Sequence, residues 1–170
     1  RADCERVTTP GGALEALHLA RERGWIRFAG ITSHSAEMMA LAIQSGLFAS
    51  MMFPYNVVEA ASSELFQTAA QAGLLTLAMK SLAGGLVPAA AGLRWLAADP
   101  AVHCLLVGMA SAGEVAANVA ALELGPLAPA EEKELLNWAR AAGQDFCRRC
   151  GYCLPCPQQI DIPMVFLLEG

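Results

Sequence analysis

Four closely spaced cysteines near the C-terminus carry the strongest chemical signal of the sequence: Cys147, Cys150, Cys153 and Cys156, followed by Pro157. Two residues separate each cysteine from the next. A tight loop with this spacing can direct several thiolates to one face of a cubane iron–sulfur cluster, and the bacterial ferredoxin run differs by one additional residue in its last gap. The spacing therefore predicts a 4Fe-4S cluster, with Cys147, Cys150 and Cys153 as the firmest ligands and Cys156 as the fourth candidate.

A structural zinc site is one alternative for the cysteine run. Zinc sites usually combine two C-x2-C pairs with a gap of about a dozen residues or more between them, and the four cysteines here are evenly spaced. Disulfides are a second alternative, typical of short secreted chains, whereas we expect no targeting segment for this chain. The corresponding alternative function is a non-catalytic zinc-binding or adaptor module.

Composition and charge argue against several classes of partner. The 170 residues suit one domain of ordinary size, and a net charge of −5 argues against nucleic acid and anionic membranes. Mean hydropathy is high at +0.42. However, the longest uncharged stretch, residues 38–58, contains Gln44, Pro54 and Asn56, so a buried core explains it better than a membrane span. We expect a cytoplasmic protein. Because the sequence begins with Arg1, we also expect it to be a fragment.

The elements that must position these residues alternate between strand and helix. The predicted strands are 26–31, 50–53, 74–79 and 102–107, and the predicted helices are 13–24, 35–45, 62 or 63–72, 89–98, one from about 111, and 129–142. The strands begin 24 to 28 residues apart, as in βα units, and they are apolar throughout, which predicts a parallel sheet covered on both faces. Four units make half of a (β/α)8 barrel; a small open doubly wound sheet is the alternative.

Serine residues are predicted to begin three of the helices. Ser35 precedes the helix that follows the first strand, and either Ser62 or Ser63 precedes the next helix. Ser111 and Glu114 have the spacing of a capping box. The single Cys104 lies in an apolar run, which favours the role of a small buried hydrophobic residue.

Four short motifs occur in the order and at the spacing of one enzyme family. They are GWIRFAGITSH at 24–34, FPYN at 53–56, KSLAGG at 80–85, and VG at 107–108 continuing to Glu114 and Asn118. The region from about 11 to 124 resembles the second half of the aldo/keto reductases, barrel strands five to eight. The helix and the cysteines that follow resemble the branch of that family with a ferredoxin-like tail.

The resemblance implies three regions: residues 1–125 as the second half of the barrel, 126–145 as a connecting helix, and 146–170 as an iron–sulfur tail that we expect to be truncated. It implies an NAD- or NADP-dependent oxidoreductase with a small carbonyl substrate, and a possible electron-transfer partner for the cluster. The family's catalytic residues come from its first four strands, which we expect outside this chain. We therefore assign no catalytic residue, expect the chain alone to be inactive, and interpret His18, His34 and His103 as structural.

The resemblance also implies a set of residues that contact the nicotinamide nucleotide. Thr32 and Ser33 match the pair that binds the carboxamide, and Asn118 matches the contact to the adenine end. Glu114 falls where an arginine commonly holds the 2′-phosphate of NADP; a carboxylate would repel that phosphate, so we expect NAD rather than NADP. The full set is Thr32, Ser33, Met79, Lys80, Ser81, Leu82, Gly108, Met109, Ala110, Ser111, Glu114 and Asn118.

Two loops carry the phosphate-binding part of this prediction. Barrel enzymes bind phosphate with the loops after strands seven and eight, through backbone N–H groups at a helix N-terminus. In this sequence those loops are 80–85 and 108–111. Met79 stands where an aromatic residue often stacks on the nicotinamide, and Met52 stands where the family has glutamine, so these two contacts depart from the family pattern.

Overall fold

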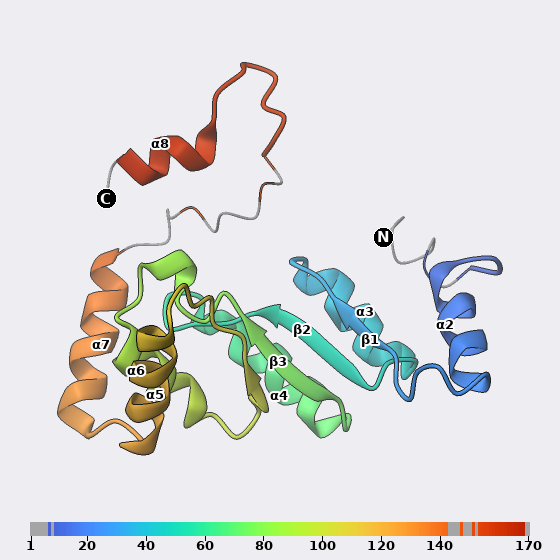
Figure 1. The fold of residues 1–170 in the computed structure, drawn as a ribbon, viewed down its shortest axis with the longest axis horizontal. Helices are drawn as coiled ribbons and strands as arrows, with labels where there is room; N and C mark the ends of the chain where they lie inside the picture. The colour runs from blue at the N-terminus through green and yellow to red at the C-terminus, as the bar shows by residue number, and fades with distance from the viewer. Residues whose placement is uncertain (1–6, 8, 143–146, 148–150, 152, 169–170) are drawn as a thin grey trace.

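A parallel sheet of four strands forms the centre of the molecule in the computed structural model, which describes residues 7, 9–142, 147, 151 and 153–168 (Figure 1). The strands are β1 (Gly30–Thr32), β2 (Ser50–Pro54), β3 (Leu75–Met79) and β4 (Cys104–Leu105). They are neighbours in chain order, and all three pairings are parallel. Doubly wound sheets turn back at a switch point, and the described strands of this sheet show no such reversal.

Helices alternate with the strands, as predicted. They are α2 (Ala13–Glu22), α3 (Ala36–Ser45), α4 (Ser63–Gln71), α5 (Ala89–Ala97), α6 (Ala112–Glu123), α7 (Pro129–Ala142) and α8 (Ile162–Leu168), with the 3-10 turns η1 (Ala60–Ser62) and η2 (Ala83–Gly85). Within the described residues, no helix is both long and apolar enough to cross a membrane. The short helix α8 had no counterpart in the sequence prediction.

Two of the three predicted serine caps are present. Ser35 Oγ accepts a hydrogen bond from the Met38 N–H at 3.3 Å, and Ser111 Oγ accepts one from the Glu114 N–H at 3.2 Å. The third prediction is correct for the position of the cap and wrong for its hydrogen bond. Ser62 occupies the N-cap position of α4, but its side chain makes no capping bond, because the preceding turn η1 leaves it in a helical conformation instead of an extended one.

One face of the sheet is covered by helices and holds the main core. Met51 and Phe53 of β2 and Ala78 of β3 are buried there against side chains of α3 and α4, among them Met39 and Phe66. Residues between them in the strands point to the opposite side, as strand geometry requires. This opposite side, which we call the open face, consists of Gly30, Thr32, Ser50, Met52, Pro54, Leu75, Leu77, Met79 and Cys104, of which Pro54 is buried.

The open face corrects the prediction of a sheet covered on both faces. None of its residues belongs to a buried cluster of the described residues, and Leu75 is 51% exposed. The strands are apolar on both sides, which is why the sequence indicated two covered faces. The described part of this chain supplies helices for one of them (Figure 1).

Both edge strands are shorter than predicted. The predicted strand at 26–31 becomes β1 from Gly30, and the predicted strand at 102–107 becomes the two-residue β4. Gly30 pairs with Ser50, the first residue of β2, so residues before it extend beyond the neighbouring strand. Trp25 and Phe28 are accordingly exposed, each at 71%. Cys104, in β4, is half-buried, less than expected.

Candidate functional site

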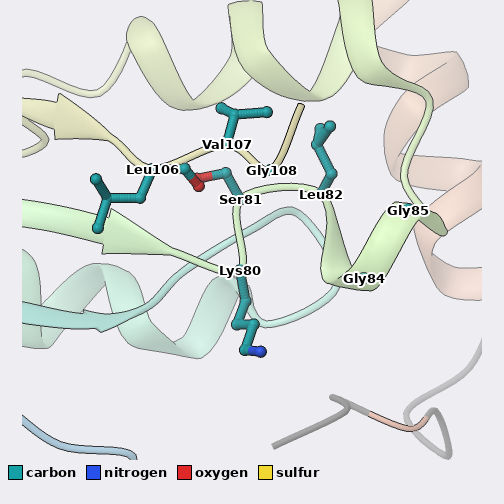
Figure 2. A pocket seen from close by; sticks show the side chains of 8 residues that line it. All are labelled: Lys80, Ser81, Leu82, Gly84, Gly85, Leu106, Val107 and Gly108. Atoms are coloured by element: carbon teal, nitrogen blue, oxygen red, sulfur yellow. The ribbon is translucent and has the colours of Figure 1, made fainter. Parts of the chain in front are cut away.

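A hollow of about 370 Å³ opens at the carboxyl edge of the sheet, between the loop after β3 and the loop after β4 (Figure 2). Its lining residues are Lys80, Ser81, Leu82, Gly84, Gly85, Leu106, Val107 and Gly108. The carboxyl ends of parallel strands meet at one edge, and ligands of α/β proteins bind there. The two loops are the pair that the sequence analysis selected for phosphate binding.

The loop after β3 has an unusual backbone. Lys80 and Ala83 have positive φ angles of 56° and 48°, and Gly84 and Gly85 have φ of 74° and 98°. A left-handed conformation costs a non-glycine residue roughly 1–2 kcal/mol, so the surrounding structure must hold Lys80 and Ala83 in place. Two internal bonds contribute: the Ala83 N–H donates to the Lys80 carbonyl, and the Gly85 N–H donates to the Leu82 carbonyl, both at 2.8 Å.

Two buried polar side chains fix this loop to its neighbours. Asn56 is fully buried, and its Nδ2 donates to the Lys80 carbonyl at 3.1 Å and to Glu59 Oε2 at 3.0 Å. Ser81 is 1% exposed, and its Oγ lies 3.0 Å from the Ala78 carbonyl and 3.1 Å from the Leu106 carbonyl, so it links the ends of β3 and β4. Buried polar groups that are fully hydrogen-bonded define one conformation, and here that conformation is the wall of the hollow.

Asn56 holds the loop after β3 in place, a role that was not predicted from the sequence although the residue belongs to the FPYN motif. Its Oδ1 accepts from the backbone N–H groups of Val58 and Glu59, at 2.9 and 3.0 Å, so the amide is bonded on both sides. The signal was present in the FPYN motif, since asparagine directly after a strand commonly organises a turn. Its contact to a loop 24 residues away depends on the fold.

The loop after β4 leads into α6, where a carboxylate covers the helix start. Glu114 Oε2 accepts a hydrogen bond from the Ala110 N–H at 2.8 Å, while the Glu114 N–H donates to Ser111 Oγ. The N-terminus of a helix attracts anions, and here the protein's own carboxylate takes up that role. A Cβ added at Gly108 would meet no atom within 4 Å, so the backbone beside the hollow is open at this residue.

The predicted nucleotide contacts fall into three groups. Lys80, Ser81, Leu82 and Gly108 line the hollow. The stretch from Met109 through Ser111 continues from the same loop, and it is exposed. Figure 2 shows the Ser81, Leu82 and Val107 side chains on one side of the hollow and the Lys80 side chain pointing away from them.

The remaining predicted contacts lie outside the hollow. Thr32 ends β1 and Ser33 follows it. β2 separates β1 from β3, and the Ser33 N–H donates to the Met52 carbonyl at 3.3 Å. Met79 ends β3 on the open face, beside Pro54. Asn118 is half-buried on α6. These residues share the carboxyl edge or its adjoining helix, and the structure leaves their contact to a nucleotide untested.

The histidines lie apart from the hollow. His103 precedes β4, at the opposite end of the strands, where its Nδ1 is 3.1 Å from the Thr76 backbone nitrogen and 2.7 Å from Thr76 Oγ1. This bonding joins the amino ends of β3 and β4. It is consistent with the structural interpretation of His103.

Part of the cysteine run lies outside the described residues. Cys150 is among those outside, Cys147 and Cys156 are half-buried, and Cys153 is exposed. In the part of the chain that is described, no three His, Cys, Asp or Glu side chains form a group able to hold a metal. The iron–sulfur cluster therefore stays a prediction from the spacing of the cysteines.

Comparison with known proteins gives a likeness to solved structures. No family model and no curated protein matches the sequence. The chain is similar to the apo form of aldo-keto reductase AKR11C1 from Bacillus halodurans, with a TM-score of 0.65 and 21% identity over 75% of this chain and 56% of that chain. The chain has an α/β fold with parallel strands that is similar to this part of an aldo-keto reductase. The holo form of the same enzyme gives a TM-score of 0.62 and 20% identity over 75% of this chain and 54% of that chain.

The aldo-keto reductase likeness is partial in length. The chain spans little more than half of each of these two structures. At about one identical residue in five, the likeness establishes the fold and leaves the activity open.

Proposed function

We propose that this chain is the cofactor-side half of an NAD(P)-dependent oxidoreductase of the aldo-keto reductase type, which acts on a small carbonyl substrate when its barrel is complete. The observation that carries the proposal is the hollow between the loops after β3 and β4, at the carboxyl edge of a sheet with the aldo-keto reductase fold. The sequence resemblance selected these same two loops for phosphate binding.

The residues of the hollow suit an anionic, phosphate-bearing ligand. Gly84, Gly85 and Gly108 allow close approach of the backbone. Ser81 and Asn56 hold the loop in one conformation, which lowers the cost of ordering it on binding. A bound nicotinamide would supply hydride-transfer chemistry, while the residues of this chain bind and orient the nucleotide.

Glu114 favours NAD over NADP in this proposal. Its carboxylate is held at the start of α6 by the Ala110 N–H, and this is the region where the resemblance expects the 2′-phosphate of NADP. Bringing a phosphate beside a fixed carboxylate costs free energy. Glu114→Gln should therefore lower the ratio of the NADH affinity to the NADPH affinity. Equal affinities for NADH and NADPH in the unchanged protein would contradict the proposed preference for NAD.

The binding test uses Gly108, because its surroundings leave room for a side chain. Gly108→Val places a branched side chain at the hollow, where its Cβ meets no other atom within 4 Å. We expect the affinity for NADH, measured through the fluorescence of the reduced nicotinamide, to fall at least about tenfold, equivalent to roughly 1.4 kcal/mol. Ala130→Val at the exposed start of α7 is the matched control. Unchanged NADH affinity in the Gly108 variant would reject the hollow as the nucleotide site.

The open face supports the half-barrel part of the proposal. In a closed barrel the inward-facing side chains of all the strands pack together, and the open face presents apolar residues such as Met52, Leu77 and Met79 without a described layer over them. We infer that residues 1–125 form half a barrel, that the missing half supplies the catalytic groups, and that the chain alone is inactive. Residues 126–145 connect this half to the tail.

For residues 146–170 we propose a 4Fe-4S cluster held by Cys147, Cys150 and Cys153, with Cys156 as the fourth candidate. Protein prepared without oxygen should be brown and contain iron, and the variant with all of the first three changed to serine should lose both properties. Cys104→Ser is the control, because Cys104 belongs to the sheet. Colourless protein containing zinc would favour the alternative, a zinc-binding or adaptor module.

The role of the cluster is tested with the same triple-serine variant in the full-length enzyme. If the cluster passes electrons to a partner, the variant should lose activity with that partner. A carbonyl-reductase rate that stays unchanged would instead indicate that the cluster stabilises the tail.

A further inference from the structure

A second hollow lies on the helix-covered side of the sheet, away from the proposed nucleotide site. It has a volume of about 250 Å³ and lies between the end of α5, the connection to α7 and the first turn of α7. Its lining residues are Tyr55, Trp95, Ala98, Asp99, Pro126, Leu127 and Glu132. Two of them are aromatic, two are acidic, and none is basic.

Asp99 is a half-buried carboxylate of this hollow. Its Oδ2 accepts a hydrogen bond from the Tyr55 hydroxyl at 2.8 Å, and its Oδ1 accepts one from the Ala101 N–H at 2.9 Å. Tyr55 is 2% exposed. Burial, together with the neighbouring Asp99 carboxylate, raises the pKa of Tyr55 to about 12. The phenol therefore stays protonated at neutral pH and donates to a carboxylate that carries the negative charge.

Glu132 adds a second carboxylate at the rim. Its side chain makes no hydrogen bond and no ion pair with any described residue, and it is exposed. The hollow also borders the end of α5, where the helix dipole is negative. The two carboxylates and the adjacent helix end thus favour a positive charge in the hollow.

The nearest arginine does not neutralise the hollow. Arg94 Nη1 and Nη2 bind the two carboxylate oxygens of Glu131, at 2.9 and 3.1 Å. Its Nε donates to the Gly125 carbonyl at 2.8 Å, and its Nη2 donates to the Pro126 carbonyl at 2.9 Å. These bonds fix the connection that forms one wall, and they leave Asp99 and Glu132 without a cation among the lining residues.

The aromatic lining indicates which class of cation would bind in the hollow. Trp95 and Tyr55 meet edge to face, with their ring centroids 5.7 Å apart. A planar guanidinium stacks on aromatic rings and forms paired hydrogen bonds with carboxylates, whereas an ammonium is more strongly hydrated. Calcium needs six or more oxygen ligands, and two carboxylates do not supply them.

We propose that this hollow binds a guanidinium group, either on a small molecule or at the end of an arginine side chain. The group would stack against the half-buried Trp95 indole and share its hydrogen bonds between Asp99 and Glu132. The proposal does not depend on the nucleotide site, since the two hollows have no lining residue in common.

The test is a titration of the whole protein with ethylguanidinium, followed through the indole N–H resonances of its tryptophans. We expect the Trp95 signal to shift, while the signals of Trp25 and Trp138 stay in place. Ethylurea has the same shape without the charge and should bind roughly tenfold more weakly. Glu132→Gln should weaken ethylguanidinium binding about three- to fivefold. Glu134→Gln is the matched control, because it makes the same charge change on α7 outside the hollow.

Three results would overturn the proposal: equal binding of ethylurea and ethylguanidinium, no effect of Glu132→Gln, or no shift at Trp95. N-acetylarginine methylamide distinguishes the two sources of the ligand. Tighter binding of this compound than of ethylguanidinium indicates an arginine side chain of a partner, and weaker binding indicates a small molecule. NADH affinity should be the same with and without ethylguanidinium, so failure here leaves the nucleotide proposal unaffected.

Discussion

The two faces of the sheet have similar side chains and very different surroundings. On the helix-covered face, Met51 and Ala78 are completely buried. On the open face, Met52 is partly exposed and Leu75 is 51% exposed, although both are equally apolar residues of the same strands. The difference between neighbouring residues therefore arises from what the described chain places over each face.

This comparison separates two questions about an apolar strand: whether its surface favours burial, and what covers that surface. A hydrophobic side chain indicates that a surface favours burial, since each square ångström removed from water contributes about 25 cal/mol. It does not indicate which segment or molecule provides the cover. The open face is thus an apolar surface over which the described residues of this chain place no covering layer.

The largest expected effect on stability comes from a matched pair of substitutions at adjacent leucines, one in the core and one on the open face. Leu74 is 5% exposed and belongs to the core, while Leu75 begins β3 on the open face. Leu74→Ala should lower the free energy of unfolding by about 2–5 kcal/mol, whereas Leu75→Ala should lower it by about 0.5 kcal/mol. Urea denaturation of the 170-residue chain measures both. Equal losses would show that the open face is covered.

A second test measures how the free energy of unfolding changes at alkaline pH because of Tyr55, which packs in the core of the helix-covered side. Tyr55 packs against Phe66 at a centroid distance of 4.8 Å, and its pKa is raised from 10.0 to about 12. The unfolded chain loses the phenol proton first, so the contribution of Tyr55 is complete below pH 10 and declines as the pH rises towards 12. Tyr55→Phe should remove this decline and cost about 1.5 kcal/mol at pH 8, because the Asp99 carboxylate loses its donor. Stability curves at pH 8, 10 and 11 check the prediction; an identical pH dependence in both proteins would contradict it.

The smallest expected effect on stability comes from changing the open face itself. Leu75→Lys should alter the free energy of unfolding of the 170-residue chain by less than about 0.5 kcal/mol. It should, however, reduce self-association, because an exposed apolar face promotes contacts between copies. Light scattering after size-exclusion chromatography measures the change, with Leu19→Lys on α2, which is also exposed, as the control. Self-association that persists in the Leu75 variant would argue that another surface is responsible.

The regular parts of the fold could be predicted because their signals are local. The apolar runs and the serine caps placed β2, β3, α3, α5 and α7 within one or two residues of their bounds. The edge strands could not be delimited in this way, since a strand exists where a partner pairs with it. β4 extends as far as its pairing with Leu77 and Ala78 allows, and no local pattern contains that limit.

The same distinction between local signals and long-range contacts applies to the candidate site. The two loops beside the hollow could be selected from the sequence, because the resemblance to barrel enzymes points to the loops after the last two strands. The contacts of Asn56 and Ser81 could not, because each side chain bonds to a carbonyl about 25 residues away in sequence. The hollow beside Tyr55 was equally hidden, since its lining comes from three separate segments of the chain.

The packing of α7 restricts how this protein can diversify. Leu135 and Ala139 form one buried cluster with Ala83 and Val87, so the helix that leads to the cysteines packs on the loop that borders the proposed nucleotide site. Close-packed interiors accept a larger side chain when a neighbour becomes smaller. A natural variant that enlarges residue 139 should therefore be tolerated best when another member of this cluster, such as residue 83 or 87, becomes smaller. We expect the helix and the loop to change together in evolution.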